Sequence, residues 1–175
     1  MATFGDLTAG GDDFPSSGDR ALLAKFTCPT AGTLTQINVF FSSASTAGMS
    51  MKGLIYADDG AGNTPGTRLG VGNAVAVPAG ASDTASTGLS VALSASTDYW
   101  IGYVADSFEA RAQMDIGGGG SSRMEGTTYA SPNATWTESG TAGNTLNAYG
   151  TYTESSSGSG ILIPTTFRMQ AILTR

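Results

Sequence analysis

The chain has 175 residues, which is enough for one domain whose core needs no disulfide or metal. Only 13% of the residues are charged and 25 are glycine, so the solvent-facing surface must consist largely of small polar side chains. The net charge of −6 argues against nucleic acid as a partner, because phosphate contacts need clustered lysine and arginine. No apolar run approaches the roughly 20 residues of a membrane helix, so no membrane partner is expected.

Short β-type segments, separated by Gly, Ser, Asn, Asp and Pro clusters, follow one another along the chain. Residues 1–19 are expected to form an N-terminal arm, followed by a single domain over residues 20–175. The predicted strands lie, in chain order, near Ala21–Thr27, Thr33–Ser42, Met49–Ala57, Arg68–Val77, Leu89–Leu93, Thr97–Ala105, Ala110–Ile116, Leu146–Tyr152 and Ile163–Leu173. This pattern predicts an all-β domain, an antiparallel β-sandwich of jelly-roll type.

Alternation of apolar and polar residues indicates which strand faces are buried. Ile37, Val39 and Phe41 share one face of their segment, which we expect to be core, and Gln36 and Asn38 share the wet face. The last predicted strand alternates in the same way, with its apolar positions at Phe167, Met169, Ala171 and Leu173.

The segment Tyr99–Val104 carries bulky residues on both faces. It is either a central strand covered on both sides or a strand whose second face meets a neighbouring subunit, and burial within the domain is favoured. Gly117–Ser122, Ser131–Asn144 and Glu154–Gly160 are expected to be loops, which carry most binding functions in sandwiches.

Catalytic groups are sparse in this chain. It has no histidine, which removes the commonest general base and the partner of a serine or cysteine nucleophile. Lys25 and Lys52 lie within predicted strands, where a solvent-facing role is the default. The nearest approach to a carboxylate cluster consists of Asp98, Asp106, Glu109 and Asp115, around an aromatic-rich strand. We therefore expect a protein that is not an enzyme and needs no cofactor.

One loop offers oxygen ligands for a metal ion. Asp58, Asp59 and Asn63 supply carboxylate and amide oxygens of the kind that calcium prefers. The same residue types dominate turns, because their side chains accept hydrogen bonds from nearby backbone N–H groups. The spacing matches no EF-hand, so a turn is the favoured interpretation and the metal site a weak candidate. Cys28 is the only cysteine and is expected to be a small buried apolar side chain.

Three aromatic residues are candidate binding residues. Trp136 lies in a polar segment, where a tryptophan needs either packing or a ligand, and Tyr129 and Tyr149 are nearby in sequence. Together they predict a sugar-stacking surface or an anchor in a protein interface. The alternative is that this loop packs down on its own sheet.

Three segments resemble a recurring pattern: Leu54–Gly60 (LIYADDG), Pro65–Leu69 (PGTRL) and Thr97–Gly102 (TDYWIG). The pattern is similar to jelly-roll modules of tailed-bacteriophage structural proteins and of some bacterial surface proteins. There a strand ends in an acidic Gly/Pro turn, and a Tyr-Trp strand follows later. The resemblance implies a jelly-roll fold over about residues 20–175 and supplies no catalytic residue.

The first functional hypothesis is a virion structural protein, a decoration or cement protein on the exterior of a tailed-phage head. Its expected partners are the major capsid protein or another virion protein, with a homo-oligomer, favoured as a trimer, on the shell. Residues Met1–Asp6 have neither a basic start nor an apolar run, so synthesis in the host cytoplasm is expected. The alternative is a carbohydrate-binding attachment module of a tail, fibre or cell surface, with a host glycan as its ligand.

Overall fold

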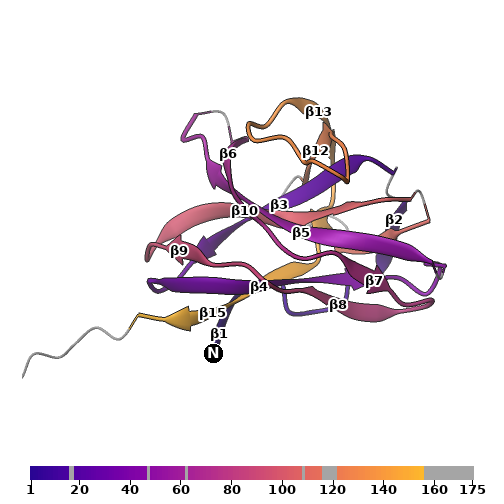
Figure 1. The fold of residues 1–175 in the computed structure, drawn as a ribbon, viewed down its shortest axis with the longest axis horizontal. Coiled ribbons are helices and arrows are strands. Elements are labelled where there is room, and N and C mark those ends of the chain that lie inside the picture. Colours follow the sequence, from indigo (N-terminus) through magenta and orange to yellow (C-terminus); the bar gives the residue numbers. More distant parts are fainter. Residues whose placement is uncertain (16–17, 47, 62, 108, 116–121, 156–175) are drawn as a thin grey trace, which may run out of the picture.

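The computed structural model describes all residues except 16–17, 47, 62, 108, 116–121 and 156–175. The described residues form two antiparallel β-sheets that pack face to face, with no helix between the strands (Figure 1). The predicted all-β class and the β-sandwich are therefore confirmed, while jelly-roll connectivity stays a prediction.

The first sheet, called sheet A below, joins strands from both ends of the described chain. Its main path runs through β1 (Ala2–Gly5), β15 (Ala148–Glu154), β4 (Gly32–Phe41), β11 (Arg111–Asp115) and β14 (Thr145–Leu146). Beside this path, β2 (Asp12–Pro15) pairs with β11, and both β8 (Ser82–Ser86) and β9 (Val91–Leu93) pair with β4.

The second sheet, sheet B, has β10 near its centre. Its path runs through β13 (Glu138–Ala142), β12 (Ser122–Gly126), β3 (Arg20–Cys28), β10 (Thr97–Ala105), β5 (Met49–Asp58) and β6 (Pro65–Val71), and β7 (Val75–Val77) pairs with β5. Nine register pairs join β10 to β3 without interruption, from Thr97↔Cys28 to Ala105↔Arg20. This long ladder gives sheet B a regular central region.

The core lies between the two sheets, where the alternation predicted it. Ile37, Val39 and Phe41 are all fully buried, which confirms the inner face of β4. Asn38, expected on the wet face, is only 5% exposed because residues on the outer side of sheet A cover it. Cys28 is buried as predicted, and burial raises the pKa of its thiol.

Both faces of β10 are covered within the domain. Tyr99, Ile101 and Tyr103 belong to the main core. Trp100 and Val104 point the other way, into a second apolar cluster on the outer side of sheet B. The favoured interpretation of this strand is therefore confirmed, and it presents no apolar face to a neighbouring subunit.

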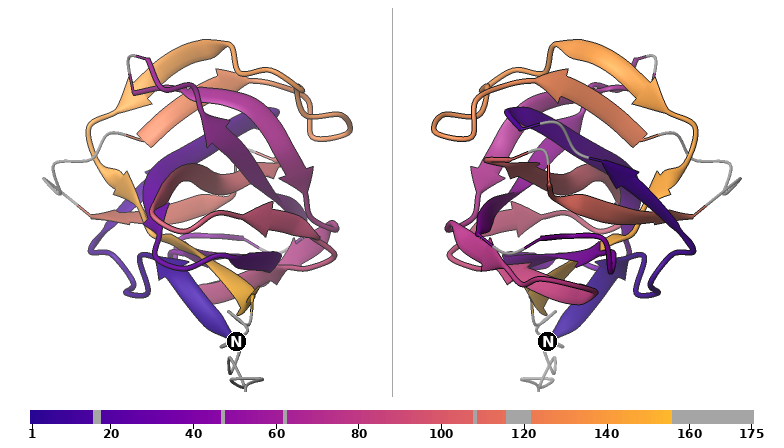
Figure 2. Two further views of the ribbon diagram at one scale, coloured as in Figure 1. Left: turned by 90° about the vertical axis from the view of Figure 1, so that its left-hand side faces the viewer. Right: turned by 90° about the vertical axis from the view of Figure 1, so that its right-hand side faces the viewer.

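The predicted N-terminal arm is wrong for the residues described. β1 pairs with β15 from Ala2↔Tyr152 to Gly5↔Tyr149, and β2 pairs with β11. Phe4 is only 4% exposed and packs edge-on against Tyr99 and Tyr152. Burial of this ring draws the segment into sheet A, and Figure 2 shows the N-terminus beside the yellow strand β15.

Other differences concern strand limits. The predicted strand at 68–77 is two strands, β6 and β7, which both pair with β5 in nearly the same register. The ladder is interrupted between them, where the backbone N–H of Asn73 bonds to Thr87 instead. The predicted loop at 131–144 contains β13, whose polar sequence lacks an apolar alternation. The expected last strand at 163–173 and nearly all of the Gly-rich segment at 117–122 lie outside the described residues.

Candidate functional site

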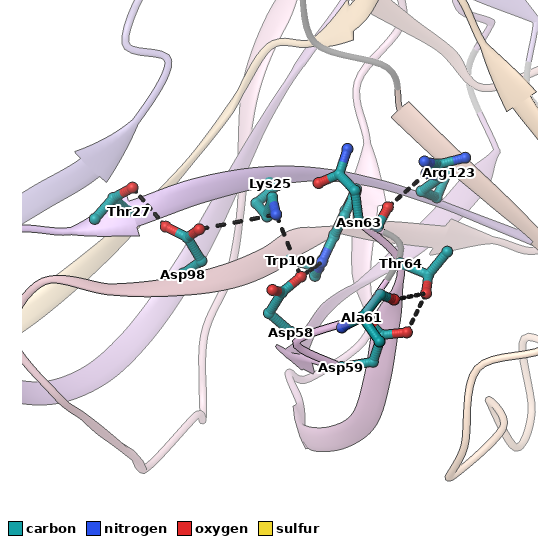
Figure 3. Close-up of polar contacts among 10 residues, drawn as sticks. All are labelled: Lys25, Thr27, Asp58, Asp59, Ala61, Asn63, Thr64, Asp98, Trp100 and Arg123. Atoms are coloured by element: carbon teal, nitrogen blue, oxygen red, sulfur yellow. Dashed lines mark hydrogen bonds and ion pairs between the residues drawn. The ribbon is translucent and has the colours of Figure 1, made fainter.

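The segments that carry the family resemblance meet on the outer side of sheet B. The indole N–H of Trp100 on β10 donates a 2.7 Å hydrogen bond to Asp58 at the end of β5. Lys25 of β3 lies 3.4 Å from the same carboxylate and 5.6 Å above the Trp100 ring (Figure 3). The acidic turn and the Tyr-Trp strand are thus locked together, because a buried indole N–H needs an acceptor.

The turn after β5 uses its polar groups internally. Asp59 accepts hydrogen bonds from the hydroxyl of Thr64 and from the backbone N–H of Ala61 at 3.0 Å. The Thr64 hydrogen bond helps to hold the pKa of Asp59 below its ordinary value. Asn63 has a left-handed backbone with φ of 59°, and its carbonyl accepts from Arg123. This geometry agrees with the turn interpretation, and Figure 3 shows these carboxylates facing protein donors.

The loop over residues 127–137 is held by a buried carboxylate. Glu125 on β12 is fully buried, and its Oε1 atom accepts hydrogen bonds from the amide of Asn133 at 2.9 Å and from the backbone N–H of Thr137 at 2.7 Å. The hydroxyl of Tyr56 donates to the carbonyl of Asn133 at 2.8 Å. Burial, followed by the charge of Glu125, raises the pKa of Tyr56. The loop is therefore packed onto sheet B.

Trp136 and Tyr129 take part in this packing. Trp136 is 9% exposed and contacts the Tyr56 ring edge-on, with ring centroids 5.5 Å apart. Tyr129 is partly buried, and Lys52 lies 4.5 Å from its ring centroid while donating to its backbone carbonyl. Of the two roles weighed for Trp136, packing on its own sheet is the one observed.

Tyr149 lies on the other sheet. It belongs to β15, and its side chain is on the outer face of sheet A, the face turned away from sheet B. The hydroxyl donates a 2.6 Å hydrogen bond to Asp83 of β8. Burial and then this bond raise the pKa of Tyr149 to about 12. Tyr149 therefore does not join Tyr129 and Trp136 in one surface, which corrects the predicted grouping.

The partners of Tyr149 form a second candidate site that the sequence analysis missed. Phe40 stacks beside it at a tilted 42°, with ring centroids 5.8 Å apart. Asn38 donates to Asp83 at 2.8 Å, and Gln36 donates to Asn38 at 2.5 Å. The sequence did contain a signal for this site. Side chains alternate between the two faces of a strand, so Phe40 falls on the same solvent-facing side as Gln36 and Asn38.

Two of the carboxylates considered for catalysis, Asp98 and Asp106, lie far apart. Asp98 is the second residue of β10 and Asp106 directly follows its last, so eight steps of extended chain, about 26 Å, separate them. Paired-carboxylate hydrolysis needs at most about 10 Å. Asp98 accepts from Thr27 and pairs with Lys25, whereas Asp106 accepts from the backbone of Ser50.

Within the part of the chain that the structure describes, no three His, Cys, Asp or Glu side chains are placed to hold a metal ion. The same residues include no helix that is long and apolar enough to span a bilayer. Comparison of the chain with protein-family models, curated proteins and solved structures finds no match.

Proposed function

We propose that this protein is a structural component on the exterior of a tailed bacteriophage, with decoration of the capsid as its role. One observation carries the proposal. The three segments that resemble phage jelly-roll modules occupy the neighbouring strands β10, β5 and β6, and the Trp100–Asp58 hydrogen bond links two of them. The sequence pattern thus corresponds to one physical unit of the sandwich.

The mechanism is an added set of contacts across the shell. The sandwich has a continuous core and a surface of small polar residues, so it is already folded when it binds. Docking then costs little conformational entropy. Contacts that exist only when neighbouring shell subunits are closed stabilise that closed state by mass action. We expect a homo-oligomer, favoured as a trimer, that bridges copies of the major capsid protein.

The first test measures copies of this chain per purified particle by quantitative mass spectrometry against the most abundant shell protein. Hundreds of copies in a fixed ratio support decoration. A handful of copies, or none, contradict it and favour a tail or surface attachment role.

A second test measures stability. Particles stripped of this protein should lose their genome at lower temperature than decorated particles, and adding back the purified protein should restore resistance. Equal resistance of stripped and decorated particles would remove the cementing mechanism. Light scattering coupled to size exclusion then determines whether the free protein is a trimer.

A further inference from the structure

A polar pocket lies just past the end of β4, the strand that carries Phe40. Its volume is about 230 Å³, and it is lined by the backbone of Gly10 and Gly11 and by Asp12, Asp13, Ser42, Ser43 and Gln113. A side chain at Gly10 would collide with the carbonyl of Met114 and the amide of Asn147, so glycine lets the chain lie flat there. The pocket wall is thus built by the close approach of this segment to β11.

Phe40 lies near the end of β4, and the pocket residue Ser42 directly follows the last residue of that strand. Ser42 comes two residues after Phe40 in extended chain, a separation of about 7 Å. Self-contained pockets for small molecules begin near roughly 300 Å³. This pocket is smaller than that, so it can hold only one unit of a longer ligand. The next unit of that ligand would then lie over Phe40 and Tyr149.

The polar groups select the chemistry of that ligand. Asp83 offers acceptor positions beside the rings, and Asp12 and Asp13 line the pocket. The Oε1 atom of Gln113 is buried and has no hydrogen-bond partner among the described residues. Arg111 lies 3.3 Å from Asp13 and offsets one of these negative charges. The remaining acceptors and negative charge suit hydroxyl donors and disfavour phosphates and carboxylates. Sugar hydroxyls supply such donors, and the apolar face of a sugar ring packs on aromatic side chains.

The aromatic pair is held in place before any ligand arrives. The chain of hydrogen bonds from Gln36 through Asn38 to Asp83 meets the bond from Tyr149 at the same carboxylate. Fixing Tyr149 in this way lowers the entropy that binding would otherwise cost. Both rings remain partly exposed, as stacking requires.

We propose that the outer face of sheet A binds a neutral oligosaccharide, with one sugar ring on Phe40 and Tyr149 and a neighbouring unit in the pocket at Ser42, Ser43 and Gln113. This binding activity is separate from capsid decoration and uses neither Tyr129 nor Trp136.

The experiment probes the full-length protein on a printed array of neutral glucans, mannans, galactans and rhamnans, followed by calorimetry with the best binder. We expect Kd values in the micromolar to millimolar range. Phe40→Ala should weaken binding at least about tenfold by removing the stacking surface. Ser43→Trp, at an exposed position in the pocket wall, should weaken it similarly by filling the pocket.

Tyr129→Ala is the matched control, because it removes another partly exposed tyrosine, from the loop that packs onto sheet B, and it should bind as the parent does. Thermal melts of each variant separate lost binding from lost folding. The proposal fails if the parent binds no printed neutral glycan, if it binds only anionic glycans, or if Phe40→Ala and Ser43→Trp bind as the folded parent does. Equal loss in Tyr129→Ala would also overturn the assignment to sheet A.

Discussion

At the residue scale, Asp58 is the acceptor on which the burial of Trp100 depends. Trp100 is fully buried, and its N–H group donates to Asp58. In Asp58→Ala the indole N–H loses this acceptor inside the protein, which costs about 1–3 kcal/mol. We expect the free energy of unfolding, measured by urea denaturation, to fall by that amount.

Asp98→Ala is the control for Asp58→Ala. Asp98 pairs with the same Lys25 at 3.8 Å, but its side chain is 40% exposed. An exposed ion pair contributes about 0–1 kcal/mol. A loss in Asp98→Ala as large as that in Asp58→Ala would mean that charge pairing with Lys25, and not the indole hydrogen bond, is the main contribution.

A second prediction concerns the carboxyl pair of Asp6 and Asp115. A hydrogen bond to Asp6, followed by partial burial, raises the pKa of Asp115. Protonation therefore favours the folded state: this contribution is full below the unfolded pKa of Asp115 and is lost as pH rises through the folded pKa. Near neutral pH both groups are charged and repel each other. Asp115→Asn should raise the melting temperature at pH 7, and the gain should vanish near pH 3.

Glu109→Gln serves as the comparison for Asp115→Asn. It removes one negative charge from an exposed position, and should therefore change the melting temperature little at either pH. If both variants gain equally at pH 7, the cause is the net charge of −6 and not the carboxyl pair.

At the element scale, the loop over residues 127–137 depends on Glu125. Two donors, the Asn133 amide and the Thr137 backbone, share its Oε1 atom. Glu125→Ala removes both hydrogen bonds from a buried site and should cost about 2–4 kcal/mol. Loosening of this loop should expose Trp136, which a red shift of tryptophan emission and faster proteolysis within 127–137 would report.

Glu125→Gln keeps an oxygen acceptor of the same shape, so it should lose less stability than Glu125→Ala. Emission and proteolysis should then stay near those of the parent. Two variants with the same large loss would show that the negative charge of Glu125, and not the acceptor at Oε1, holds the loop.

The elements that could be predicted from sequence are those with a strong local pattern. The strand at Thr97–Ala105 was predicted with the limits that the structure gives, because bulky residues continue on both faces. β13 was missed because its sequence, ESGTA, is polar and lies at the edge of sheet B, where pairing with β12 determines its form. β1 was missed because its pairing partner is almost the whole chain away.

The candidate sites, like the missed strands, depend on pairing between distant parts of the chain. Trp136 and Tyr149 are only 13 positions apart in sequence. Even so, Trp136 packs on sheet B, whereas Tyr149 belongs to β15 of sheet A. Phe40 and Tyr149 are far apart in sequence and become neighbours through the pairing of β4 with β15. Closeness in sequence wrongly grouped Tyr149 with Tyr129 and Trp136. The contact of Tyr149 with Phe40 depends on how two distant strands pair, and the sequence of either strand alone does not reveal that register.

At the scale of the whole molecule, Phe4 joins the beginning and the end of the described chain. Its ring packs against Tyr152 of β15 in its own sheet and against Tyr99 of β10 in the other sheet. The Phe4 ring therefore stabilises both the packing of the two sheets and the pairing of β1 with β15. An N-terminal arm reaching a neighbouring subunit would contribute nothing to the stability of the isolated domain.

Phe4→Ala distinguishes these two roles. Removal of a buried phenylalanine costs about 3–5 kcal/mol, a large part of the roughly 5–15 kcal/mol by which domains are stable. We expect the urea midpoint to fall steeply while unfolding remains one transition, since the ring belongs to the common core. Leu7→Ala, at a side chain 56% exposed, should leave the midpoint nearly unchanged. If Phe4→Ala had the same urea midpoint as Leu7→Ala, the N-terminal segment would contribute nothing to the core and would behave as a separate arm.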